Sequence, residues 1–222
     1  MNIVTRKLIA KELYVNRWFV AGGAASGVIS ILLAATGKMG FNVGALTWLT
    51  AIIATGVMLG IYGVMNERKE HALQFVLSLP LSIADYVRAK MLGVSACFLV
   101  MWLVSSGAAL LLVFWKESIP DGIAPYTVLL CVFMLANFMV VLCGSIHAQS
   151  EALTSAVIVV TNMNITLFIF LILGHPALRD HLHAPAPVWN SIFWTVLSVE
   201  IATLVVTLSL PYIVAARRRD FI

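Results

Sequence analysis

The chain has 222 residues, of which 61% are hydrophobic and only 11% are charged, and its formal net charge is +4. Soluble globular domains have about a quarter of their residues charged, so this composition excludes an ordinary soluble domain and indicates a membrane protein. Its Lys and Arg residues gather at the ends of apolar runs, which a membrane surface explains better than nucleic acid does, so we expect lipid as a partner and no nucleic acid.

Six apolar runs follow one another along the chain, and each is long enough to cross a hydrocarbon core of about 30 Å as a helix. None of them alternates with a period of two, so the fold class is all-α integral membrane, with one transmembrane domain over residues 1–222. The basic stretch before the first run is expected to be an N-terminal interfacial helix, with Lys7 and Lys11 on one face. The predicted spans are residues 18–36, 43–65, 91–115, 126–146, 152–173 and 188–215.

The basic residues fall unevenly on the two sides of this six-span layout. Most of them flank the termini and the loop after the second span, and three lie on the opposite side, namely Lys38, Lys116 and Arg179. The positive-inside rule therefore predicts that both termini are cytoplasmic.

The loop between the second and third spans is the longest polar interruption of the chain. Read as a helix, it is amphipathic, with Ala72, Phe75, Val76 and Leu79 on one face. Pro80 ends that helix, and Ser82 followed by Asp85 is the pattern that begins a new one. Without further information, the amphipathic segment fits equally well a helix that docks on a soluble partner and one that lies on the bilayer surface.

This loop resembles the cytoplasmic loop of ABC-2 type transporter permease subunits, which holds a coupling helix. The resemblance is carried by Glu67, Arg68, Leu73, Leu77, Pro80, Leu81, Ser82, Tyr86 and Lys90. The chain departs from many members at His71 and Ala72, where they have Gly-Thr. The six-span layout extends the likeness over the whole length.

The resemblance implies that the loop docks on a separate cytoplasmic ABC ATPase. The residues it assigns to this coupling are Glu67, Arg68, Ala72, Phe75, Val76 and Leu79. The chain has no phosphate-binding G-x-x-x-x-G-K-[ST] motif, so it is not expected to be an enzyme or to hold a cofactor; ATP and Mg would bind to the partner. The resemblance further implies a second permease copy, or a similar subunit, in the inner membrane of a prokaryote.

Polar residues inside the apolar runs are the candidates for a pathway or a polar core. They are Thr47, Thr50 and Thr55 in the second span, Asn162 and Asn164 in the fifth, and Glu200 and Thr203 in the sixth. The resemblance implies that the second and fifth spans line a central pathway, whereas hydrogen bonding between helices explains Asn and Thr equally well. A carboxyl in mid-span is costly, so Glu200 is expected to face other helices rather than lipid.

No metal site is expected. Between the last two spans, Asp180 lies among His175, His181 and His183, but the spacing matches no zinc pattern, and Pro176 instead indicates the start of a short helix. The function that the resemblance implies is that of an exporter permease, and the mostly apolar interior favours an amphipathic or hydrophobic cargo. The alternatives are the haem-handling permease of cytochrome c maturation and a non-transporting membrane scaffold that recruits a soluble partner.

Overall fold

A computed structural model describes residues 3–65, 82–148 and 150–217 of the chain. Within these ranges there are helices and no strands. The six long helices are α1 (Ile3–Ala34), α2 (Lys38–Gly60), α5 (Ile83–Trp115), α6 (Ala124–His147), α7 (Glu151–Gly174) and α9 (Ser191–Arg217). The short ones are a π turn, η1 (Ile61–Met65), a 3-10 turn, η2 (Asp121–Ile123), and α8 (Pro176–Arg179). All six long helices are long and apolar enough to cross a membrane, which confirms the expected all-helical class and is consistent with the six expected spans.

Local capping sets where several of these helices begin. Ser82 accepts a hydrogen bond from the backbone N–H of Asp85 at 3.1 Å, as the sequence pattern predicts for the start of α5. α8 begins at Pro176, again as predicted. α9 begins at Ser191, three residues later than predicted, because the side chain of Asn190 accepts from the N–H of Phe193 at 2.8 Å and caps the helix there.

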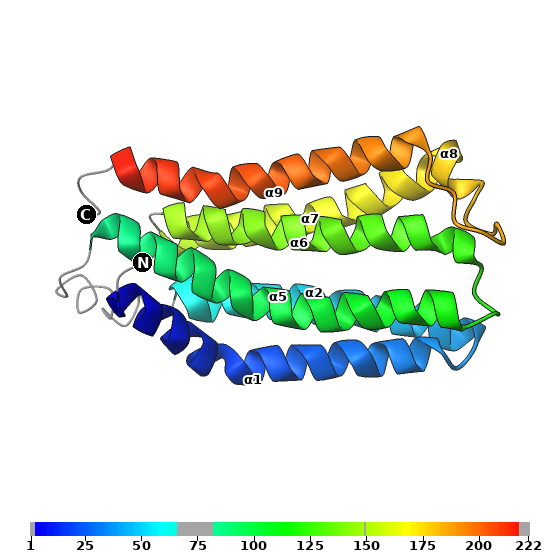
Figure 1. The fold of residues 1–222 in the computed structure, drawn as a ribbon, viewed down its shortest axis with the longest axis horizontal. Coiled ribbons are helices and arrows are strands. Elements are labelled where there is room, and N and C mark those ends of the chain that lie inside the picture. Colours follow the sequence, from blue (N-terminus) through cyan, green and yellow to red (C-terminus); the bar gives the residue numbers. More distant parts are fainter. Residues whose placement is uncertain (1–2, 66–81, 149, 218–222) are drawn as a thin grey trace.

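The six long helices run up and down in one bundle (Figure 1). α1 and α5 begin at one end of the bundle, and α9 finishes there. α2, which η1 continues, also finishes at that end. We call this the terminal end and the opposite one the far end. α1 packs along α5 and α2, while α7 and α9 pack on α6. Most of α6 is buried, so this helix is the centre around which the others are arranged.

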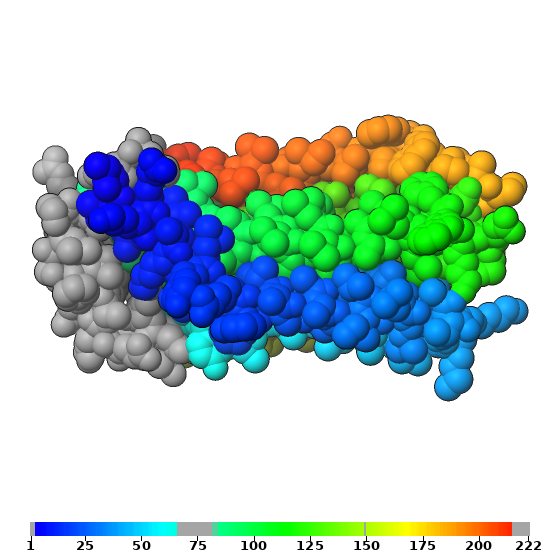
Figure 2. Space-filling model, turned by 60° about the horizontal axis from the view of Figure 1, so that its bottom comes forward, coloured from blue at the N-terminus to red at the C-terminus, as the bar shows by residue number. Residues whose placement is uncertain are grey.

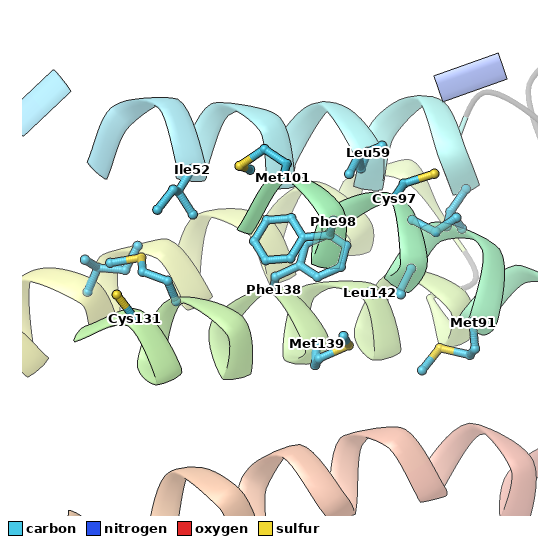
Figure 3. Packing of buried hydrophobic residues seen from close by; sticks show 14 of the residues in the cluster. Ile52, Leu59, Met91, Cys97, Phe98, Met101, Cys131, Phe138, Met139 and Leu142 are labelled. Atoms are coloured by element: carbon cyan, nitrogen blue, oxygen red, sulfur yellow. The ribbon is translucent and has the colours of Figure 1, made fainter. Parts of the chain in front are cut away.

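The main core lies between α2, α5 and α6 (Figure 3). At its centre the rings of Phe98 and Phe138 stack with centroids 3.8 Å apart. Two tryptophans of the same region form hydrogen bonds between helices through their indole N–H groups. Trp102 donates to the carbonyl of Cys131 at 2.8 Å, and Trp48 donates to the carbonyl of Ser105 at 3.2 Å. Aromatic packing and satisfied polar tips thus hold these three helices in a fixed arrangement.

The N-terminal stretch is not a separate interfacial helix, contrary to the sequence-based expectation. It is the first half of α1, continuous with the first span, and it bends toward the start of α5 (Figures 1 and 2). Thr5, Glu12 and Asn16 are buried there. Glu12 accepts from the ammonium of Lys90 at 2.7 Å, and both side chains are nearly inaccessible to solvent. This buried ion pair fixes the segment against the start of α5.

Small residues allow α1 to approach its neighbours closely. A Cβ atom at Gly23 would collide with Thr55 of α2, and one at Gly27 would collide with Ser105 of α5. A Cβ at Gly93 of α5 would lie only 2.8 Å from Cβ of Glu12. The small residues of the first span therefore serve helix packing within the chain.

Candidate functional site

A groove runs along α6 between α7 and α9. It forms because α7 and α9 each pack on α6 but scarcely touch each other. Its far half, which we call the α7–α9 groove, has a volume of about 540 Å³. The residues that line it are Phe133, Ala136, Asn137 and Val140 of α6, Thr161, Asn164, Phe168, Leu171 and Ile172 of α7, His175, and Ile192, Thr195, Val196, Val199, Glu200 and Thr203 of α9. Val140 and Thr161 also line a second hollow of about 480 Å³ that continues toward the terminal end.

The groove is mostly apolar along its walls, and most of its polar groups lie about halfway across the bundle, with Thr195 and His175 nearer the far end. Phe133 and Phe168 stack across its base with ring centroids 3.9 Å apart. Its rim is open to the surroundings of the bundle, because Leu171 is 73% and Val199 is 62% exposed. A hydrophobic molecule can therefore enter sideways, from the membrane, without crossing the bundle core.

Glu200 occupies the inner wall of the groove and, as predicted, faces other helices, with 5% of its surface exposed. Neither carboxylate oxygen has a hydrogen-bond partner among the residues that the structure describes. The nearby hydroxyls do not supply one: Thr203 donates to the carbonyl of Val199 at 2.9 Å, and Thr207 to that of Thr203 at 2.8 Å, both within α9. A buried carboxyl without a partner is costly, so this position calls for a ligand or another donor.

Asn162 and Asn164, which the sequence places together, point to different sides of α7. Two residues correspond to about 200° around a helix, so the two amides cannot share a face. Asn164 lines the groove, is exposed, and makes no hydrogen bond to the part of the chain that the structure describes. Asn162 is instead turned toward α2 and α6, where its Oδ1 accepts from Asn137 at 3.4 Å and its amide donates to the carbonyl of Ile158 at 2.7 Å.

The threonines of the second span lie away from the groove. Thr47 and Thr50 are exposed, and each donates to a backbone carbonyl one turn earlier in α2. Thr55 is buried in the contact with α1, opposite Gly23. The structure therefore brings Asn164, Glu200 and Thr203 together in one cavity and leaves the other candidates outside it.

Asn137 and His175 are groove residues to which the sequence analysis gave no such role. Asn137 is buried in the most apolar stretch of α6, and a polar residue in mid-span was the available signal. His175 follows α7 directly and lies at the far mouth of the groove. No group of three or more metal-ligating side chains occurs within the described ranges.

The residues assigned to ATPase coupling, Glu67, Arg68, Ala72, Phe75, Val76 and Leu79, lie outside the described ranges. Their flanking elements are described: η1 ends at Met65 and α5 starts at Ile83, and both points are at the terminal end of the bundle. When the chain was compared with models of known protein families and with curated proteins, neither comparison gave a match.

Proposed function

We propose that the chain is the permease subunit of an ATP-driven ABC-2 type exporter that moves an amphipathic or hydrophobic cargo. The supporting observation is where the loop that resembles a coupling loop is attached. It joins η1 to α5 at the end of the bundle that also holds the beginning of α1 and the end of α9. With both termini cytoplasmic, as the basic residues predict, the loop faces the compartment in which an ATPase would be found.

The buried Glu12–Lys90 pair offers a route by which docking acts on the bundle. Lys90 lies in the second turn of α5, directly after the loop, and its ammonium is 2.7 Å from the carboxylate of Glu12 in α1. Gly93, one turn further along, brings the two helix backbones close together. A push on the start of α5 would therefore move α1 with it, because breaking the pair would leave the buried carboxylate of Glu12 without its ammonium partner.

The proposed complex contains two permease copies, or one copy and a similar subunit, in the inner membrane of a prokaryote. Each permease contacts a cytoplasmic ABC ATPase, which holds ATP and Mg. The permease contributes no chemistry of its own, and its part is to bind cargo and to change shape. The α7–α9 groove suits an amphipathic cargo, since it combines apolar walls, a few polar groups and an opening toward lipid.

The test is co-purification of an ATPase with a Walker A motif from native membranes, followed by substitution in the loop. Phe75→Ala removes the largest apolar side chain of the predicted docking face and should cost about 2 kcal/mol, the usual threshold for an interface hot spot, or about 30-fold in affinity. Gln74→Ala, about 150° around the predicted helix from the centre of that face, is the matched control and should leave binding unchanged.

The readouts are pull-down of the ATPase and its cargo-stimulated turnover, measured in one nanodisc preparation. Both should fall together in Phe75→Ala. If both stay at the parent level, Phe75 is not a docking anchor and the bilayer-surface helix gains support. If no ATPase is recovered at all and another soluble protein binds the loop instead, the chain is a membrane scaffold and the exporter proposal fails.

A further inference from the structure

We propose that the α7–α9 groove binds a lipophilic amine, meaning a long hydrophobic molecule that ends in a protonated amino group, with the amino group at Glu200. This inference deepens the proposed function, because it names the class of cargo. It depends on the proposed function only in that the bound amine would be the molecule that is exported. Binding itself needs neither the ATPase nor ATP.

The shape of the groove selects a slender hydrophobic ligand that comes from the bilayer. Its volume of about 540 Å³ falls within the range typical of small-molecule sites. Phe133 and Phe168 provide a flat apolar surface at its base, and Val196 lies half-buried in the wall formed by α9. Because the rim at Leu171 and Val199 is exposed, a ligand can slide in from lipid and keep its tail in an apolar environment throughout.

The charge of the groove selects the head group. Glu200 is the one acidic residue among the residues that line it, and none of these is Lys or Arg. Both oxygens of Glu200 are buried without a hydrogen-bond partner among the described residues. An ammonium group supplies hydrogen-bond donors to these oxygens and a countercharge that favours the ionised carboxyl, and a charge-assisted hydrogen bond is about twice as strong as a neutral one.

A second polar group lies at the same depth on the other wall. The side chain of Asn164 is exposed in the groove, and its amide oxygen can accept one of the three protons of an ammonium. Since Glu200 is only 5% exposed, we expect its side chain to turn toward the ligand on binding. A neutral alcohol of the same length would fit the apolar walls but would supply no countercharge to the carboxyl.

The experiment measures binding of two radiolabelled probes, dodecylamine and dodecanol, to the full-length permease in phosphatidylcholine nanodiscs at neutral pH. The parent protein should bind the amine at least tenfold more tightly than the alcohol, since a hydrogen bond to a charged group contributes roughly that factor or more. Glu200→Gln keeps the shape of the side chain and should abolish this preference while leaving dodecanol binding unchanged. Glu117→Gln removes an exposed acid outside the groove and should behave like the parent.

A second pair of variants tests the location. Val196→Trp fills the groove and should weaken binding of both probes at least tenfold, whereas Val205→Trp, on the exposed side of the same helix, should not. Monodispersity and thermal stability of each variant show that it is folded. Retention of the amine preference in Glu200→Gln, or parent-like binding in folded Val196→Trp, would overturn the proposal. If Val196→Trp changes the oligomeric state instead, and amine binding follows the oligomer, the groove is a subunit interface and the proposal is likewise overturned.

The outcomes separate this inference from the exporter proposal. If amine binding depends on Glu200 but no ATPase co-purifies with the protein, the binding site is supported and the exporter proposal is rejected. If an ATPase co-purifies with the protein but the amine does not bind, the amine site is rejected and the exporter proposal remains. The cargo would then bind elsewhere.

Discussion

Replacing Lys90 with methionine tests whether the buried ion pair holds the N-terminal half of α1 against α5. Methionine keeps most of the length and apolar stem of lysine and removes the ammonium. The carboxylate of Glu12, whose side chain is 7% exposed, is then left buried and alone, because its strongest partner lay 2.7 Å away. Asn16 compensates little, since its amide is 3.5 Å from the second carboxylate oxygen.

The expected loss of stability follows from this geometry. Breaking one side of a buried pair typically costs about 3–5 kcal/mol, and solvent screening is slight here because the Lys90 side chain is only 3% exposed. Replacing both partners with methionine removes the orphaned charge as well, so the double variant should lie close to the parent. The matched control is Arg88→Met, which removes an exposed basic residue from the same turn of α5 and should change stability by less than about 1 kcal/mol.

The assay is unfolding of the purified permease in mixed micelles with increasing sodium dodecyl sulfate, followed by tryptophan fluorescence. Lys90→Met should unfold at a clearly lower detergent fraction than the parent, and adding Glu12→Met should restore the midpoint. If Lys90→Met unfolds at the same detergent fraction as the Arg88→Met control, the pair does not hold α1 in place. If the double variant is as unstable as the single one, the loss comes from packing rather than from an unpaired carboxylate.

Three further predictions concern packing, the mid-span acid and topology. Gly23→Ala should destabilise the bundle by about 1–3 kcal/mol because its Cβ would collide with Thr55, whereas Gly22→Ala, which has open space, should be neutral or slightly stabilising in the same unfolding assay. Glu200→Leu should leave the unfolding midpoint unchanged or raise it, because the carboxyl has no partner among the described residues, while the preference for dodecylamine over dodecanol is lost; a large drop in stability would show that the carboxyl is a necessary structural contact. A reporter fused after Arg179 should report the external side, and a cytoplasmic signal there would remove the predicted orientation.

The sequence by itself determined the spans and most of their ends. Whether a segment is helical and crosses a membrane depends on the length of an apolar run and on capping residues three or four positions away, and both are local properties. The start of α5 at Ser82 and that of α8 at Pro176 were predicted for this reason. The expected burial of Glu200 also followed locally, from the cost of exposing a carboxyl to lipid.

The tertiary structure alone decided which of the polar residues meet. Glu12 and Lys90 are 78 positions apart, and no local pattern marks either as the other's partner. The α7–α9 groove exists because two helices pack on a third with scarcely any contact between them, and the distance between them is set by side-chain packing over the whole bundle rather than by either sequence. Helix geometry by itself separates Asn162 from Asn164, but only the packing of α7 and α9 on α6 brings Asn164 and Glu200 into one groove.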